Sequence, residues 1–206
     1  MKKIVNAVTS FKKLLKAIEP LVKNFPELLK TKRLPDSSLN ATEMWGNWLL
    51  CAVLRKNISG EITFADDGEG DGIILDRRTG AGRQTEHVCA LDNPNSGKIL
   101  PWGEQRIIDA INLKINKQYS DAEELVLVVF FDGAREWHRD KVRAAINGRS
   151  KFKGVYLIGL HTLDEKGWTY SVTELHENHS ITYLVRINPD FTHWSVWKWE
   201  DSPIPN

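Results

Sequence analysis

Cysteine is scarce in this sequence, with only Cys51 and Cys89 among 206 residues, each between apolar neighbours. So low a count excludes a disulfide framework and a cysteine-rich zinc site, and we expect both thiols to be reduced core residues of a cytoplasmic protein. No apolar run approaches the roughly 20 residues that a membrane helix needs. Lysines also interrupt the apolar stretch after the initial MKKIV, so neither a signal peptide nor a membrane partner is expected.

Long blocks of like charge are absent too, which excludes a charged disordered tail. The formal net charge of +1 nevertheless hides an asymmetry. The first 35 residues hold nine basic and two acidic side chains, a balance of +7, which leaves −6 for the remainder. Such a basic segment can attract a nucleic-acid backbone. The solvated face of an amphipathic helix is the commoner origin of the same pattern.

The length and a hydrophobic content of 41% are typical of one globular domain with a terminal extension. Apolar spacing predicts helices over residues 5–18, 21–29, 40–55, 103–116 and 137–147. Strand-like runs cover residues 60–65, 71–77, 84–91, 125–131, 154–160, 168–175 and 180–187. We therefore expect an α/β protein with a mixed central sheet flanked by helices. It comprises a basic helical N-terminal extension (1–35), an α/β core (36–160) and C-terminal antiparallel strands packed on the same domain (161–206).

A turn at Thr79–Gly82 predicts a β-hairpin that brings two carboxylates together. With the turn centred near residues 79–80, position 71 lies opposite 88, and Asp71 and Glu86 become diagonal neighbours on one face, roughly 7–8 Å apart. Two carboxylates at this separation offer hard oxygen ligands to Mg²⁺ or Mn²⁺. Taken singly, Asp71 could be a turn residue and Glu86 a water-facing residue of an edge strand.

The αβββαβ order, with Asp71 in GDGIILD and Glu86-His87-Val88 in TEHVCAL, resembles the PD-(D/E)XK nuclease superfamily. The motif of that family is an Asp, a variable hairpin, and then Glu or Asp, any residue, and Lys. The resemblance covers about residues 40–160 and implies a restriction-endonuclease-like core with a β-rich C-terminal extension. Glu43 lies where the family often has a metal-binding glutamate on its first helix, although a helix N-terminal capping role is its ordinary alternative.

The resemblance implies a nuclease that depends on Mg²⁺ or Mn²⁺ and hydrolyses phosphodiester bonds, with DNA as the expected substrate. Asp71 and Glu86 would be its catalytic residues, and Asp71, Glu86 and Glu43 its metal ligands. A homodimer would suit an enzyme that cuts both strands of a duplex.

The sequence departs from the family motif at Val88, which stands in place of the lysine and has no polar group to position water. His87 is no replacement, because alternation along the strand points it to the opposite face. Some family members take the missing polar group from the helix after the hairpin, where Glu104 and Gln105 are the candidates. The departure keeps a second interpretation open, a catalytically inactive nuclease-fold protein that binds nucleic acid or protein.

Aromatic and histidine-rich segments near the C-terminus give weaker signals. His176 and His179 could ligate a metal, but without further ligands in sequence we favour an exposed polar turn. The C-terminal tryptophans could stack on bases, although a small satellite core is the preferred interpretation. The eight tryptophans and the near-neutral charge also suit a third class, a protein-interaction module without a nucleic-acid role.

Overall fold

A computed structural model describes residues 6–31, 37–66, 68, 70–91, 103–131 and 137–199. The helices in these ranges are α1 (Phe11–Lys23), α2 (Phe25–Lys30), α3 (Ala41–Asn57), α4 (Glu104–Ile115) and α5 (Arg139–Ile146). The strands are β1 (Asn6–Ala7), β2 (Ile62–Asp66), β3 (Ile73–Asp76), β4 (Gly82–Ala90), β5 (Val126–Phe131), β6 (Gly154–Asp164), β7 (Gly167–Leu175), β8 (Ser180–Ile187) and β9 (Trp194–Lys198). None of these helices has the length and apolar character needed to cross a membrane.

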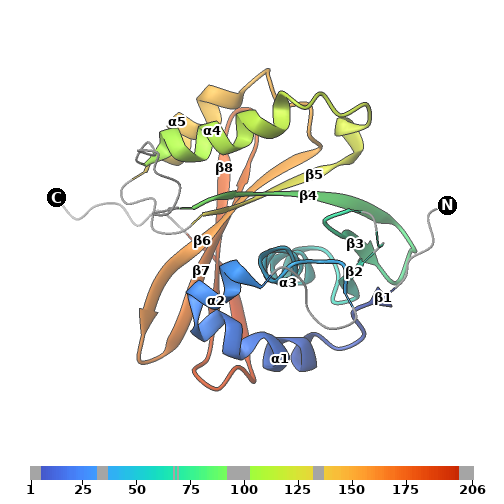
Figure 1. The fold of residues 1–206 in the computed structure, drawn as a ribbon, viewed down its shortest axis with the longest axis vertical. Helices are drawn as coiled ribbons and strands as arrows, with labels where there is room; N and C mark the ends of the chain where they lie inside the picture. Colours follow the sequence, from blue (N-terminus) through green and yellow to red (C-terminus); the bar gives the residue numbers. More distant parts are fainter. Residues whose placement is uncertain are drawn as a thin grey trace.

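The nine described strands form one sheet whose spatial order follows the chain, from β1 to β9 (Figure 1). Neighbouring strands are antiparallel except at the centre, where β4, β5 and β6 run parallel. The parallel pairs β4–β5 and β5–β6 are connected through α4 and α5. The expected mixed α/β class with a helix-flanked sheet is therefore confirmed, and from α3 to β5 the order is helix, three strands, helix, strand.

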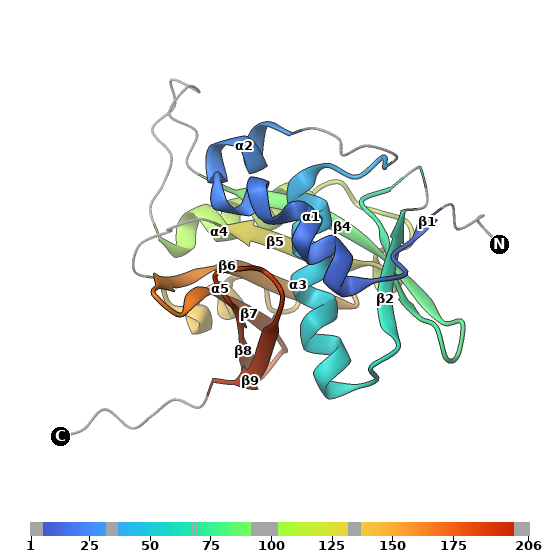
Figure 2. The same cartoon turned by 90° about the horizontal axis from the view of Figure 1, so that it is seen from below.

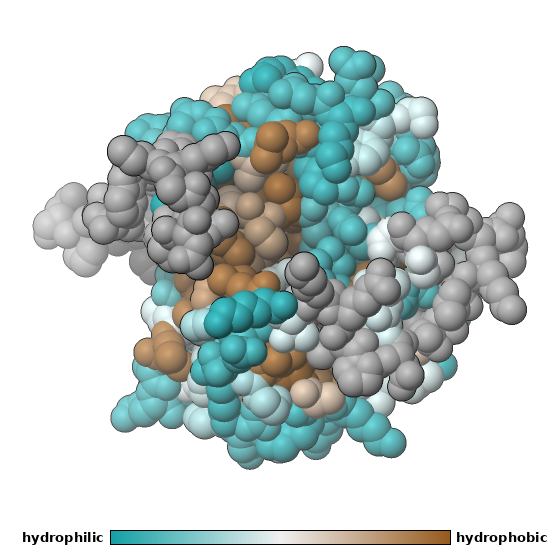
Figure 3. Space-filling model, viewed as in Figure 1, coloured by the Kyte–Doolittle hydropathy of each residue, from teal (hydrophilic) through white to brown (hydrophobic). Residues whose placement is uncertain are grey.

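The sheet is strongly curled: in Figure 1 the strand direction turns progressively across it, from β4 and β5, which run across the view, to β8, which runs nearly vertically. Helices α4 and α5 cover one face, and α3 lies in the hollow of the other face, with α1 and α2 outside it (Figures 1 and 2). Figure 3 shows the outer surfaces of both helical layers as largely hydrophilic, with hydrophobic residues exposed in the band between the layers.

Strand β5 separates two hydrophobic clusters because its side chains alternate between the faces of the sheet. Val126, Val128 and Phe130 join the cluster around α1, α2 and α3. Leu127, Val129 and Phe131 join the cluster under α4 and α5. All six residues are buried, because helices cover both faces of the sheet at this strand.

Helix α3 is buried on nearly all sides. Its predicted start is confirmed, because Asn40 and Glu43 form a reciprocal capping box. The curled sheet surrounds the helix, so that Leu50 and Cys51 are as fully buried as Trp45 and Trp48. The spacing of apolar residues along one helix does not indicate that a curled sheet will surround that helix.

Three local expectations are corrected. Helix α1 continues through Pro20 to Lys23, because one missing N–H does not outweigh the burial of Ile18 and Val22 on either side of it. Cys51 lies in the core as expected, but Cys89 is exposed on β4. The helix predicted from residue 5 begins only at Phe11, because Asn6 and Ala7 pair with β2 as strand β1. The lysines of α1 lie on its solvated face, as the amphipathic interpretation expects, and Lys16 and Lys23 both pair with Glu19.

Candidate functional site

The ladder between β3 and β4 is short and sets the position of Asp71. Ile73 pairs with Gln84 and Leu75 with Gly82, and the N–H of Thr85 donates to the carbonyl of Gly72 at 2.8 Å. The predicted register, with position 71 opposite 88, is therefore wrong by two residues. The strands join through residues 77–81, and the observed pairs centre the hairpin between residues 78 and 79, closer to Asp71 than expected, so that Asp71 lies beside Glu86 and His87 instead.

Asp71 lies two residues before the start of β3, alongside β4. Its Oδ2 accepts a hydrogen bond from the backbone N–H of His87 at 2.6 Å. Because β3 begins only at Ile73, no backbone carbonyl of β3 lies opposite the N–H of His87. The Asp71 carboxylate accepts this hydrogen bond in place of such a carbonyl. This contact holds the carboxylate in the plane of the sheet, next to the side chain of Glu86.

A buried polar network fixes the backbone of Asp71 to helix α3. The Nδ2 of Asn47, which is fully buried, donates to the Asp71 carbonyl at 2.8 Å, and its Oδ1 lies 3.1 Å from Nε2 of His87. Gly72 has a φ of +120°, and a Cβ at this position would lie 2.6 Å from Nδ2 of Asn47. Only glycine therefore allows both the turn and the Asn47 contact.

His87 points towards α3, on the face opposite to Glu86, as strand alternation predicts. Burial lowers the pKa of the imidazole to about 3, with a smaller contribution from the positive charge of Lys114. The ring is therefore neutral at physiological pH, and its Nε2–H donates to Oδ1 of Asn47. It positions the loop of Asp71 and is no candidate for acid–base chemistry.

The depressed pKa of His87 predicts a loss of stability in acid. The unfolded chain takes up a proton at the ordinary pKa of 6.5, whereas the folded protein does so only near 3. Its contribution to the free energy of unfolding is therefore complete above pH 6.5 and falls progressively between pH 6.5 and 3. We expect denaturant unfolding at several pH values to give a steeper dependence for the wild type than for His87→Gln, which keeps a donor for Asn47. Equal slopes would contradict a buried neutral His87.

Glu86 points to the other face of β4, towards the end of α4. Its Oε1 accepts from Nζ of Lys114 and from the hydroxyl of Tyr119, the latter at 2.6 Å. The side chains of Lys114 and Glu86 are only 12% and 19% exposed. Burial raises the pKa of Tyr119, and its hydrogen bond to the Glu86 carboxylate raises it further, so that the phenol remains a donor. Lys114 and Tyr119 are not among the sequence-predicted site residues.

The two residues proposed to replace the motif lysine lie elsewhere. Glu104, at the start of α4, pairs with Lys141 of α5 at 2.8 Å, and the amide of Gln105 donates to Asp109. Instead, Lys114 at the end of the same helix places its ammonium group on Glu86.

Glu43 reaches the same region from the first turn of α3. Its Oε2 accepts from the backbone N–H of Asn40 at 2.9 Å as part of the capping box. Burial raises the pKa of Glu43, and the nearby charges of Asp71 and Glu86 raise it further, whereas the Asn40 hydrogen bond and Lys114 oppose the rise. The capping role and proximity to the other carboxylates are therefore both present.

The carboxylates of Asp71, Glu86 and Glu43 lie close enough to repel one another. Burial raises the pKa of Asp71, the hydrogen bond from His87 lowers it, and the negative charge of Glu86 raises it again. Within the described ranges, however, no three His, Cys, Asp or Glu side chains are grouped tightly enough to form a metal cluster. The structure thus brings Asp71 beside Glu86, with Glu43 as an electrostatic neighbour that is engaged in capping.

The C-terminal aromatic and histidine residues have mainly structural contacts. His176 and His179 stack with ring centroids 4.3 Å apart, and Nε2 of His176 lies 3.5 Å from Oε2 of Glu174. Trp194 packs on Phe11 and Trp48 in the core. Trp194 thus joins the main core and not a separate satellite core, whereas Trp197 and Trp199 are 37% and 40% exposed.

Comparison of the chain with protein-family models, with curated proteins and with solved structures finds no match in any of the three.

Proposed function

We propose that the protein is a metal-dependent nuclease that hydrolyses phosphodiester bonds, most simply in DNA, with Asp71 and Glu86 as its metal-binding and catalytic carboxylates. One observation carries the proposal: the edge of β4 brings together two partly buried carboxylates and one lysine that come from three separate elements. Partly buried like charges are costly to maintain and are typical of functional sites.

The donor set fits a hard divalent cation. Mg²⁺ is usually held by one or two carboxylates, with water and substrate phosphate completing its octahedron, so a pair of carboxylates suffices without a three-residue cluster. Oδ2 of Asp71 accepts the hydrogen bond from the His87 N–H. Oε1 of Glu86 accepts from both Lys114 and Tyr119. The second oxygen of each carboxylate is directed to no hydrogen-bond partner among the described residues. Glu43 would support the site through its charge.

Lys114 supports the resemblance to the PD-(D/E)XK nucleases at the position where the sequence departs from them. Val88 and Glu86 share one face of β4, and the residues at the C-terminal end of α4 lie on that face. An ammonium group reaches Glu86 from the helix, although the strand does not carry a lysine. The antiparallel β2–β3–β4 unit with β5 parallel to β4 agrees with the αβββαβ order on which the resemblance rests.

The roles of the residues follow from these contacts. A bound Mg²⁺ would supply an acidified water and stabilise charge on the phosphoryl oxygens. Asp71 and Glu86 offset the charge of the cation, and the hydrogen bonds from His87 and Tyr119 fix their orientation. Lys114 offers positive charge beside Glu86, where it can orient a water molecule or approach a phosphate oxygen.

The satisfied contacts of Glu86 favour one alternative, the inactive nuclease-fold protein. The ion pair with Lys114 and the hydrogen bond from Tyr119 neutralise the carboxylate without a metal. Such a protein would bind nucleic acid through its basic segment without cutting. Its binding should weaken with salt and on neutralising Lys12 and Lys13, which are exposed on α1.

Thermal unfolding with and without metal separates the two proposals before any substrate is known. Burial and like charge raise the pKa of Asp71, so metal-free protein carries unfavourable negative charge at pH 8. We expect Mg²⁺ or Mn²⁺ to raise the midpoint of unfolding by several degrees at saturating concentration. Asp71→Asn, which keeps the acceptor for His87, should abolish this rise and should itself be more stable than the wild type without metal.

The same metals are then tested for cleavage of a panel of single-stranded, duplex and flap DNA substrates. Cutting that requires Mg²⁺ or Mn²⁺ and stops with a chelator supports the proposal. Salt-dependent binding without cutting, together with no thermal shift by either metal, would reject it in favour of the inactive alternative.

A further inference from the structure

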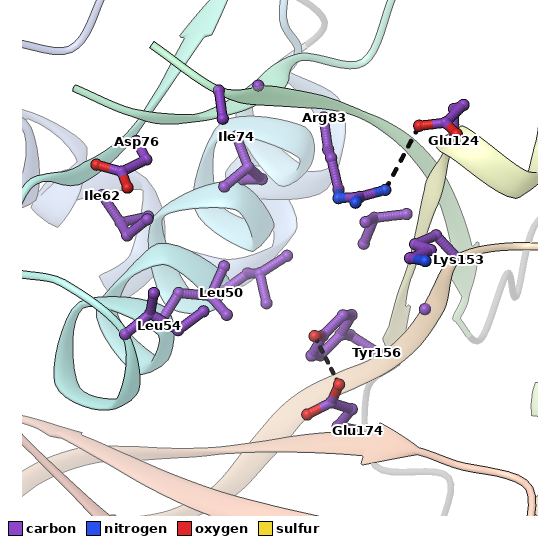
Figure 4. A pocket seen from close by; sticks show the side chains of 15 residues that line it. Leu50, Leu54, Ile62, Ile74, Asp76, Arg83, Glu124, Lys153, Tyr156 and Glu174 are labelled. Carbon is purple, nitrogen blue, oxygen red and sulfur yellow. Dashed lines mark hydrogen bonds and ion pairs between the residues drawn. The ribbon is translucent and has the colours of Figure 1, made fainter. Parts of the chain in front are cut away.

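A cavity of about 400 Å³ opens at the end of α3 remote from Glu43 and lies on the opposite face of β4 from Glu86. Its volume is within the range of small-molecule sites, roughly 300–1,000 Å³. In Figure 4 its walls come from α3, from the β3–β4 hairpin and from the starts of β5 and β6. The aliphatic side chains that line it are Leu50, Leu54, Ile58, Ile62, Ile74 and Val126.

Two cations enter the cavity from the same side. In Figure 4 the guanidinium of Arg83 extends from β4 into the cavity, and Lys153, the residue before β6, lines the same cavity. The partner of Arg83 is Glu124, at 3.6 Å and 80% exposed, so water screens this pair strongly. The ammonium of Lys153 has no acidic partner among the described residues.

The other carboxylates that line the cavity are already satisfied. Oε1 of Glu174 accepts from the Tyr156 hydroxyl at 2.9 Å. Asp76 accepts from the backbone N–H of Arg78 at 2.9 Å and also lies near its guanidinium. The cavity therefore combines an aliphatic wall with two weakly compensated cations, and its acidic groups have little remaining capacity to attract a cationic ligand.

We propose that this cavity binds a small amphipathic anion, whose apolar body packs between α3 and the hairpin while its carboxylate, sulfonate or phosphate group lies between Arg83 and Lys153. Ile58 fits this assignment, because a large aliphatic side chain that is 64% exposed lies among the lining residues and would be covered by the ligand. The site does not depend on the proposed nuclease activity.

A matched pair of fluorescent probes tests the proposal. The anion 1-anilinonaphthalene-8-sulfonate and the uncharged N-phenyl-1-naphthylamine share one aromatic body and differ in the sulfonate. We expect the sulfonate to bind the native wild type more tightly. Arg83→Gln and Lys153→Gln should each weaken its binding about two- to fivefold, as expected for a partly exposed ion pair, and leave the uncharged probe unchanged.

Two further variants test the apolar wall of the cavity and the effect of removing a lysine outside it. Leu54→Gln should weaken both probes, because it makes the apolar wall polar. Lys151→Gln, which removes a nearby lysine outside this cavity, should change neither. Unfolding midpoints close to the wild type establish that each variant is folded. Equal affinity of the sulfonate for wild type, Arg83→Gln and Lys153→Gln, or no effect of Leu54→Gln on either probe, would overturn the assignment.

Discussion

Glu86→Gln is expected to lower metal-dependent cleavage of DNA at least roughly 100-fold, because it removes the negative charge that holds the metal while keeping the shape of the side chain. The amide oxygen can still accept from Tyr119, so the local packing is preserved. Rates of cleavage of the best substrate at saturating Mn²⁺ measure the effect.

Glu104→Gln provides the matched control for this loss. It also removes a glutamate–lysine pair that involves α4, but that pair joins Lys141 at the other end of the helix. The control should cleave within about twofold of the wild type, as is usual for a half-exposed ion pair. If Glu86→Gln cleaves as well as this control, Glu86 is not a catalytic residue.

Lys114→Ala is expected to reduce cleavage by roughly 10²-fold or more, because it removes the cation beside Glu86. Lys114→Arg keeps the charge but changes its geometry and should retain part of the activity. The informative variant is the double substitution Val88→Lys with Lys114→Ala, which moves the lysine from α4 to the strand position of the family motif.

Partial recovery in this double variant would show that the cation, rather than its position in the sequence, is required. The single variant Val88→Lys, which contains both lysines, is the control for damage to the packing under α4. A double variant no more active than Lys114→Ala, with Val88→Lys itself active, would contradict the assigned role of Lys114. Retained activity in Lys114→Ala would contradict it directly.

The position of Lys114 near Glu86 can be predicted from the sequence, provided that the direction of the helix relative to β4 is also considered. Lys114 lies seven residues after Ile107 and three after Ile111, and so belongs to the stripe that packs on the sheet. A crossover helix runs opposite to the parallel strands it connects, so its C-terminal end returns to the level of Glu86, near the start of the pairing between β4 and β5. Glu104 shares the stripe, which makes it a candidate in the sequence, but it lies at the opposite end of the helix and pairs with Lys141.

The contact between Asp71 and β4 is harder to predict from the sequence. Alternation and turn residues predicted the hairpin, but its register depends on the backbone turn, and a slip of two residues leaves every side chain on its predicted face. The predicted hairpin therefore places Asp71 near Glu86 correctly, but it sets Asp71 opposite residue 88 and misses the contact with His87. The hydrogen bonds of Asn47 and His87 depend on the curled sheet around α3, which no local pattern reports.

Crystals soaked in Mn²⁺ and measured by anomalous scattering test the central claim most directly. We expect one ion bound by oxygens of both Asp71 and Glu86, at about 2.0–2.6 Å. We expect no ion at the same place in Glu86→Gln crystals soaked under identical conditions. Wild-type crystals in which these two carboxylates bind no Mn²⁺, at a concentration that supports any cleavage observed in solution, would contradict it.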